Sequence, residues 1–117
     1  MVLGRLKRYS GSLATCSIVW HELCFGVSRL APGRRRSGLE ACLRGLSESD
    51  LDILEYDQSA AQWHATVRAE LSACGVSSPF ANGQIAAIAA TRGLVLVTRN
   101  VKDFGHFSGI EVENWWE

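Results

Sequence analysis

The segment that most constrains the fold is a continuous apolar run, Leu94-Val95-Leu96-Val97-Thr98. Apolar residues at consecutive positions are typical of strands buried on both faces, as the central strands of parallel sheets are. The preceding segment, residues 80–90, is rich in small side chains, which let a helix lie close against a sheet. Ser78-Pro79 predicts the start of this helix, with serine as the cap and proline at the first helical position. We therefore expect a helix that leads into a buried parallel strand.

The rest of the chain alternates between strand and helix patterns. Short apolar runs predict strands at Leu13–Cys16, Asp52–Tyr56 and Glu111–Trp115. Helical spacing predicts helices over residues 2–10, 17–30 with Ser17 as cap, 34–46 and 59–73. Alternating strands and helices indicate an α/β sandwich around a mostly parallel sheet. A chain of 117 residues fits a single domain, expected to span 1–117.

The composition, 47% hydrophobic and 21% charged, is that of a folded globular protein. No apolar run approaches the roughly 20 residues of a membrane-spanning helix, and no secretory signal is visible, so we expect a cytoplasmic protein without a membrane partner. The cysteines, Cys16, Cys24, Cys42 and Cys74, form no CxxC pair, which argues against a zinc site. We interpret them as small core residues, and a metal would have to use oxygen ligands.

Charge is unevenly distributed, although the net charge is zero. Residues 1–46 hold eight lysines and arginines against Glu22 and Glu40, so this part is basic and the remainder acidic. The pattern fits a basic face for a polyanion, and equally a mixed solvated surface.

Three places combine polar groups with an expected position at the carboxyl edge of the sheet, where α/β proteins bind ligands. Glu22 shares the apolar face of its helix, and a carboxylate buried there needs a partner such as a metal ion. Alternatively, Glu22 lies at the edge of that face and reaches water or an arginine. Asn82 lies early in its helix, as a ligand or as an ordinary first-turn residue. Residues 98–104 offer oxygens and two cations, or form a turn held by side-chain hydrogen bonds.

Motifs at these same places resemble the PIN-domain family, in particular VapC-type toxins. Ser17-Ile18-Val19-Trp20-His21-Glu22-Leu23-Cys24-Phe25-Gly26 follows the family's strand–Ser–Glu-Leu–Gly pattern. Pro79-Phe80-Ala81-Asn82-Gly83-Gln84-Ile85-Ala86-Ala87 resembles its Pro-Phe-Ala-Asp-Gly-Gln-Ile-Ala-Ala stretch, and Leu96–Phe104 its Thr-Arg-Asn-x-x-Asp-Phe motif. Residues 109–115 fit its C-terminal strand. The match covers essentially all 117 residues, with the motifs in the family's order.

The resemblance implies a PIN-like three-layer α/β/α sandwich and a Mg²⁺- or Mn²⁺-dependent endoribonuclease, the toxin of a type II toxin–antitoxin system. It implies a cognate antitoxin and single-stranded RNA as partners, and family members often form homodimers. By resemblance the catalytic residues are Glu22, Asn82 and Asp103, and the metal ligands are these three with Asn100. Thr98, Arg99 and Lys102 are the expected substrate contacts.

Two features depart from the family pattern. The family begins with a central strand ending in Leu-Asp-Thr-Asn, which has no counterpart here, so we expect that strand and most of the first helix to be missing through a truncated or misassigned start. Without it, the neighbouring strands would lack a partner between them. Asn82 stands where the family has Asp, which removes a negative charge. We therefore expect weak metal binding and impaired cleavage.

Two further functions remain open on the sequence alone. One is a non-catalytic toxin relative that still captures an antitoxin, with Trp20, Phe25 and Trp63 as candidate anchors or core residues. The other is an RNA-binding module whose Arg34, Arg35 and Arg36 contact phosphates.

Overall fold

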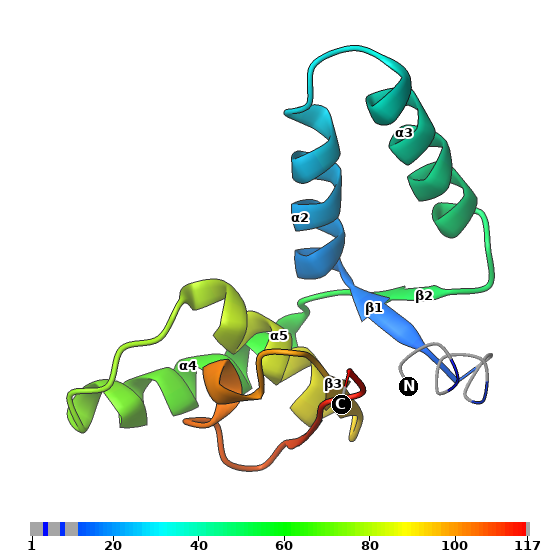
Figure 1. Ribbon diagram of the computed structural model, residues 1–117. Coiled ribbons are helices and arrows are strands. Elements are labelled where there is room, and N and C mark those ends of the chain that lie inside the picture. Colours follow the sequence, from blue (N-terminus) through cyan, green and yellow to red (C-terminus); the bar gives the residue numbers. More distant parts are fainter. Residues whose placement is uncertain (1–3, 5–7, 9–11, 117) are drawn as a thin grey trace.

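Helices and short strands alternate along the computed structural model, which describes residues 4, 8 and 12–116 (Figure 1). The strands are β1 (Ala14–Cys16), β2 (Asp52–Leu54), β3 (Val95–Val97) and β4 (Glu111–Glu113). The helices are α2 (Ser17–Ser28), α3 (Arg34–Ser47), α4 (Gln58–Ala73), α5 (Phe80–Thr91) and the short 3-10 helix η1 (Val101–Phe104). The expected α/β class is confirmed. The helix expected over residues 2–10 falls almost wholly outside the described residues.

The strands form two separate parallel pairs. β1 pairs with β2, with Thr15 opposite Ile53, and β3 pairs with β4, with Leu96 opposite Val112. Both pairings are parallel, as the alternating pattern predicted. Among the described residues no strand joins the pairs into one sheet.

The molecule has an angular shape, because α2 and α3 form an arm that projects from a body made of α4, α5, η1 and the second strand pair (Figure 1). Its radius of gyration is 15.7 Å, whereas a compact domain of this length has about 13–14 Å. α3 packs against α2, and neither helix contains a fully buried residue. Within the described residues, no helix is both long and apolar enough to cross a bilayer.

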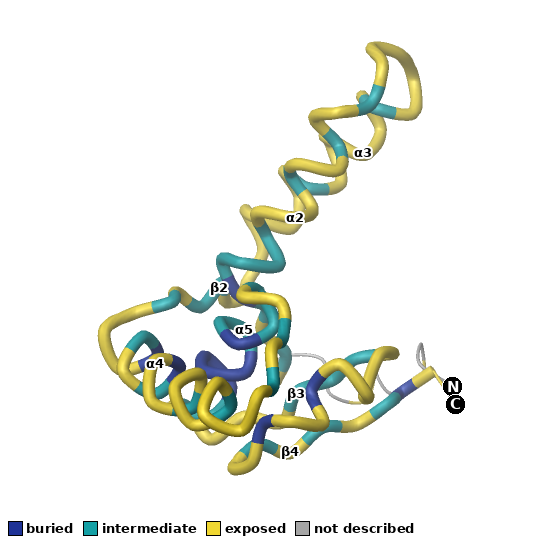
Figure 2. Tube along the Cα trace, turned by 90° about the vertical axis from the view of Figure 1, so that its left-hand side faces the viewer, coloured by how far each residue is buried: buried dark blue, intermediate teal, exposed yellow. Residues whose placement is uncertain are grey.

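The core is centred on α5, which carries buried residues over most of its length (Figure 2). On one side Ala87 and Ile88 pack with Cys16 of β1 and Ala60 of α4. On the other side Ala86 packs with two aromatic rings, Phe104 and Phe107. Ile85 and Trp63 contact both clusters, so α5 connects the two halves of the molecule.

Both predicted serine caps are wrong. α2 begins directly at the end of β1, so that Cys16 is the N-cap in an extended conformation and no side chain caps the helix. At α5 the N-cap is Pro79 itself, whose ψ of 135° excludes it from the first helical turn, and Ser78 makes no cap bond. Asp57 supplies a true cap, since its carboxylate accepts a 3.0 Å hydrogen bond from the Ala60 amide.

Two burial predictions also need correction. The apolar run 94–98 is shorter as a strand than expected and is not fully buried, because Leu94 and Val95 are 40% and 43% exposed. Of the cysteines, Cys16 is buried and Cys24 partly so, but Cys42 and Cys74 are exposed. Cys42 lies on α3, which is covered on one side only, and Cys74 lies in the turn after α4.

Candidate functional site

The three predicted catalytic residues lie on three elements that meet at α5. α5 carries Asn82 and contacts both α2, which carries Glu22, and η1, which carries Asp103. Ile18 and Val19, in the first turn of α2, pack against the core cluster that contains Ala87 and Ile88 of α5. The last residue of η1, Phe104, packs against Ala86. Glu22 and Asn82 each lie about one helical turn from these packed residues, and Asp103 directly precedes Phe104.

The turn after β3 gathers the expected oxygen ligands of that segment. The Thr98 amide donates to the Glu113 carbonyl at 3.0 Å, which continues the pairing with β4. The Thr98 hydroxyl accepts a hydrogen bond from the backbone amide of Asn100 at 3.1 Å. The backbone carbonyl of Asn100 accepts one from the backbone amide of Asp103 at 3.0 Å. The structural alternative for residues 98–104, a turn held by a side-chain hydrogen bond, is therefore correct. These bonds leave the side chains of Asn100 and Asp103 exposed.

Glu22 differs from the expectation of an inward-facing carboxylate. It is exposed, because α2 extends away from the body after its first turn and buries none of its residues fully. Asn82 is partly buried in the first turn of α5, where its backbone amide donates a hydrogen bond to the Pro79 carbonyl at 3.1 Å. The side chains of Glu22, Asn82 and Asp103 form no hydrogen bond or ion pair within the described chain, so their oxygens are available.

The donor chemistry fits a hard divalent cation, although the negative charge is low. Glu22, Asn82, Asn100 and Asp103 offer carboxylate and amide oxygens, the ligand type that Mg²⁺ and Mn²⁺ take. Only two of them are charged. No group of three or more His, Cys, Asp or Glu side chains capable of holding a metal occurs in the described part of the chain.

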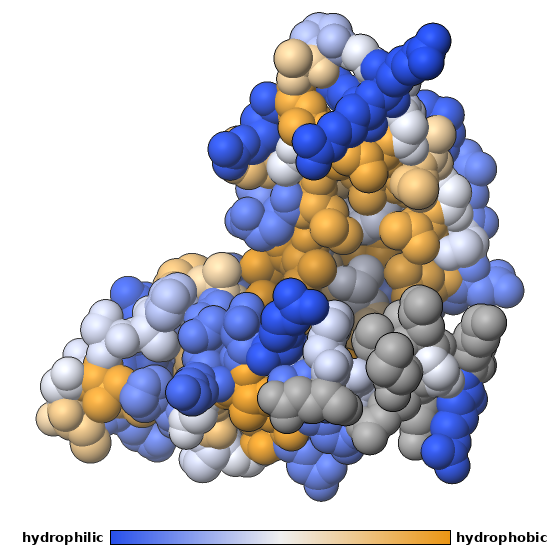
Figure 3. All heavy atoms as spheres, in the orientation of Figure 1, coloured by the Kyte–Doolittle hydropathy of each residue, from blue (hydrophilic) through white to orange (hydrophobic). Residues whose placement is uncertain are grey.

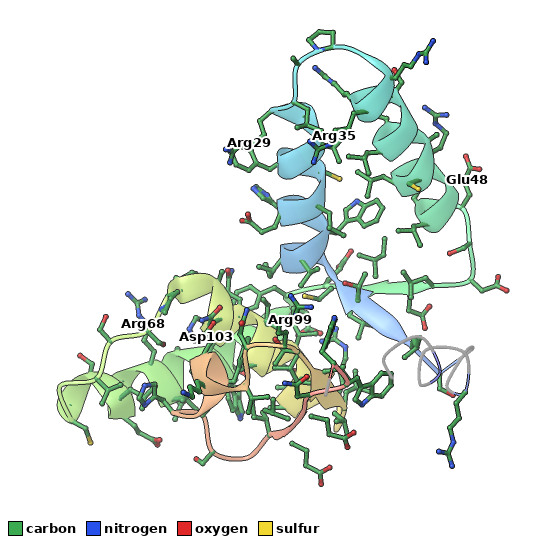
Figure 4. All side chains as sticks on the ribbon, in the orientation of Figure 1. Arg29, Arg35, Glu48, Arg68, Arg99 and Asp103 are labelled. Carbon is green, nitrogen blue, oxygen red and sulfur yellow. The ribbon has the colours of Figure 1, made fainter. Side chains whose placement is uncertain are left out.

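The basic residues expected to contact RNA lie on two separate parts of the molecule (Figure 4). Arg99 belongs to the body near Asp103, with its guanidinium carbon 5.6 Å from the Trp116 ring centre. Lys102, which directly precedes Asp103, is exposed. The arginines of α3 lie on the arm, where Arg36 is held by Glu40 at 3.7 Å and by the Leu30 carbonyl at 3.2 Å. An RNA contact through α3 would therefore use Arg34 and Arg35 rather than Arg36.

A cluster around His64, which the sequence analysis did not single out, fixes the start of α5. His64 is only 4% exposed, and its Nδ1 lies 3.0 Å from the Tyr56 hydroxyl. Its ring centre is 4.8 Å from that of Phe80 and its Nε2 faces Gly83, the residue after Asn82. Burial, with a smaller effect from the Arg68 charge, lowers the pKa of His64 below 6.5. The helical spacing with Ala60, Val67 and Leu71 was the available signal that His64 faces inward.

The candidate aromatic anchors also have different positions. Trp63 belongs to the core, with its ring 6.4 Å from that of Phe107, so the core interpretation is correct for this residue. Trp20 is partly buried, and Phe25 is 54% exposed on the arm. Leu23, Leu39 and Leu46 are exposed apolar residues on the same two helices. Figure 3 shows apolar residues gathered on the arm and in its angle with the body.

No protein-family model matches the chain. It is nevertheless 34% identical over 112 residues to the tRNA(fMet)-specific endonuclease VapC of Salmonella typhimurium, a match that covers 95% of this chain and 81% of that protein. A chain of the DNA-bound VapBC structure from the same organism superposes with a TM-score of 0.85 at 31% identity, over 97% of this chain and 83% of that one. VapBC-5 of Mycobacterium tuberculosis, a member of the VapBC family of toxin–antitoxin systems, gives a TM-score of 0.70 at 31% identity, over 86% and 79%. The chain belongs to the VapC family of ribonucleases.

Proposed function

We propose that this chain acts in the cytoplasm as the endoribonuclease toxin of a toxin–antitoxin pair, with a divalent-metal site formed by Glu22, Asn82, Asn100 and Asp103. The observation that carries the proposal is that the sequence match to ribonucleases coincides with the contacts of α2 and η1 with α5. These three elements carry Glu22, Asp103 and Asn82, and Asn100 directly precedes η1. The runner-up, a non-catalytic chain that only binds an antitoxin, uses the same fold and differs in having no cleavage activity.

The residues have distinct roles in this proposal. Glu22 and Asp103 supply the negative charge that attracts the cation, and the amide oxygens of Asn82 and Asn100 complete the ligand set. The ion would offset charge on a phosphate and activate a water for attack on phosphorus. Arg99 and Lys102 contact neighbouring RNA phosphates, while the Thr98 hydroxyl holds the turn through the Asn100 amide.

Two carboxylates attract a strongly hydrated divalent ion weakly, so we expect low metal affinity and slow cleavage. The test is a fluorescent single-stranded RNA incubated with the purified chain in Mn²⁺ or Mg²⁺, with and without EDTA. EDTA-sensitive cleavage that falls at least tenfold in Asp103→Asn and in Glu22→Gln is expected. Glu70→Gln, which changes an exposed carboxylate on α4, is the matched control and leaves the rate unchanged. Cleavage that persists equally in all three variants refutes this site.

For the partner, we propose that the antitoxin packs on the apolar residues of the arm. Phe25 and Leu23 of α2 and Leu39 of α3 are exposed apolar side chains, which protein interfaces commonly bury. Co-expression with a candidate antitoxin tests this: the wild-type chain co-purifies with the antitoxin, and Phe25→Glu loses it. Val101→Glu, at an exposed apolar residue of η1, is the control that keeps the partner. Retention of the partner by Phe25→Glu contradicts the arm as the docking site, and self-association through the arm assigns that surface to a homodimer instead.

A further inference from the structure

A small pocket lies between the second half of α4 and the segment that connects α4 to α5. This segment turns back along the helix, because Gly75 has a φ of 74° and the Val76 amide donates a hydrogen bond to the Leu71 carbonyl at 2.8 Å. The pocket has a volume of about 180 Å³, whereas sites that enclose a whole ligand commonly have about 300–1,000 Å³. It therefore admits one small group. None of the four proposed metal ligands lines it.

The lining of this pocket combines buried rings with groups that donate hydrogen bonds. His64 and Phe107, the buried residues, are 4% and 5% exposed. Burial lowers the pKa of His64 below 6.5, so that at neutral pH Arg68 carries the one charge among the lining residues that the structure describes. The hydroxyl groups of the lining belong to Ser72, Ser77 and Ser78. A guanidinium and three hydroxyls around one small pocket are suited to an anion.

These donors are available to a ligand. No carboxylate of the described residues pairs with Arg68, whose guanidinium carbon instead lies 5.0 Å from the centre of the Phe80 ring. Contact with the ring restricts the long side chain, so Arg68 loses less conformational freedom when it binds an anion. Within the described part of the chain, no side-chain hydrogen bond is made by the hydroxyls of Ser72, Ser77 and Ser78.

The pocket lies near the residues proposed to bind the metal. Phe80 is the first residue of α5, and Asn82 follows two residues later. Phe107 packs against η1, the helix that carries Asp103. In Figure 4 both Arg68 and Asp103 are on the upper side of the body, toward the arm. An RNA strand with one phosphate at the metal site carries further phosphates on either side, so one of these can reach a neighbouring pocket.

We propose that this pocket binds one backbone phosphate of single-stranded RNA outside the metal site. The inference rests on the proposed ribonuclease function, although phosphate binding here requires no metal. The two non-bridging oxygens of a phosphodiester accept hydrogen bonds from the forked edge of the Arg68 guanidinium, and the serine hydroxyls donate to the same group. Such a contact carries no base preference, so it positions the strand for cleavage without selecting its sequence.

Binding is measured without cleavage, by fluorescence anisotropy of a fluorescein-labelled single-stranded RNA titrated with the full chain in EDTA. Titrations at about 50 to 200 mM NaCl give the dependence of the affinity on salt. Arg68→Gln should weaken binding about tenfold at the lowest salt, through the loss of one charge-assisted contact. The log–log slope should become shallower by about 0.7, the effect of one phosphate contact on a single strand. Arg68→Lys keeps the charge and should keep the slope.

Arg29→Gln is the matched control. The Arg29 guanidinium carbon lies 5.6 Å from the centre of the Phe25 ring, which is 54% exposed, much as Phe80 is 51% exposed. Arg29 follows the last residue of α2 and does not line the pocket. The control should leave both affinity and slope unchanged, with circular dichroism showing that each variant is folded. Equal losses in the two glutamine variants, or binding by Arg68→Gln that matches the wild type, overturn the proposal.

Two further arms identify the source of the phosphate. A strand of the same sequence with uncharged methylphosphonate linkages should bind the wild type and Arg68→Gln equally, because the contacted charge is absent. A loss in Arg68→Gln with this uncharged strand would indicate a base contact and overturn the proposal. Binding of inorganic phosphate that needs Arg68, beside RNA binding that does not, would assign the pocket to a free phosphate and also overturn it.

Failure of this inference is distinguishable from failure of the proposed function. Cleavage that needs Asp103, together with RNA binding that is insensitive to Arg68, overturns the phosphate pocket and leaves the nuclease in place. Arg68-dependent RNA binding by a chain that cleaves nothing supports the pocket and refutes the nuclease.

Discussion

Gly83→Ala is expected to destabilise the protein, because the helix at this position has no room for a methyl group. A Cβ at Gly83 would lie 2.6 Å from Cδ2 and 2.9 Å from Cε1 of His64, and closer still to Nε2. The imidazole cannot move aside easily, since it is 4% exposed, bonded to Tyr56 and packed against Phe80. The clash therefore displaces α5 or His64 from its place.

The magnitude follows from two opposing effects. Overpacking a well-filled site costs about 1–3 kcal/mol, and three ring atoms within contact distance favour the upper end. Replacing glycine by alanine inside a helix contributes about 1 kcal/mol of stability. We expect a net loss of about 2 kcal/mol in the free energy of unfolding. Gly45→Ala in α3 is the control, because its new Cβ has no atom within 4 Å, and it should stabilise the protein by up to about 1 kcal/mol.

A double-mutant cycle separates the clash from other effects. In a His64→Ala background the ring is absent, so Gly83→Ala changes sign and stabilises the protein by about 1 kcal/mol. The coupling between the two substitutions is then about 3 kcal/mol, measured by urea unfolding of the four proteins at pH 7.5. A coupling near zero, with Gly83→Ala equally harmful in both backgrounds, would refute the assigned contact between His64 and Gly83.

Three further predictions concern protonation, charge and a bridging arginine. The pKa of His64 is lower in the folded chain than its usual 6.5, so the unfolded chain binds the proton first as the pH falls. The contribution of His64 to stability is therefore complete above pH 6.5 and declines below it. Between pH 7.5 and 5 the urea midpoint should fall less in His64→Gln than in the wild type, and parallel profiles would contradict this. Asn82→Asp adds a charge to the proposed metal site and should raise Mn²⁺ affinity in calorimetry at least about tenfold, or 1.4 kcal/mol; an unchanged affinity would exclude position 82 as a ligand. Arg92→Ala removes bonds of 3.1 Å to the Glu55 carbonyl and 3.3 Å to the Asp57 carboxylate. Since that pair is partly exposed, thermal unfolding should show a loss of only about 1 kcal/mol, and a loss above about 3 kcal/mol would mean that Arg92 has a larger structural role.

Sequence patterns located the helices and strands well because they are local. The helix predicted from spacing over residues 59–73 carries Trp63, Val67 and Leu71 on one face, and these residues pack against the cluster of Phe104 and Phe107. The helix ends at residue 73, as predicted, and Gly75 after it has a φ of 74°, which glycine adopts without strain. The predicted N-caps of α2 and α5 were wrong, because which of two adjacent residues is the N-cap depends on backbone angles that the residue type does not determine.

Exposure was harder to predict, since it depends on which parts of the chain are packed together. Glu22 shares a helical face with Val19, yet Val19 packs against the core and Glu22 does not, because α2 leaves the body between them. Cys42 is exposed for a similar reason, as α3 has only α2 to pack against. The type of a residue indicates whether it is suited to the core or to solvent. Whether it is buried depends on which elements pack against it in the folded chain.

The relative positions of the candidate site residues therefore depend on α5 more than on the strands. β1 and β3 belong to separate pairs, so within the described residues no ladder of hydrogen bonds fixes the elements that follow them, α2 and the η1 turn, relative to each other. Ile85 does so instead, because it packs in both core clusters. Asn82 lies one turn before Ile85, and the close approach of His64 requires a glycine at position 83 between them. A shift of α5 caused by a methyl group at position 83 would consequently move Asn82 relative to both Glu22 and Asp103.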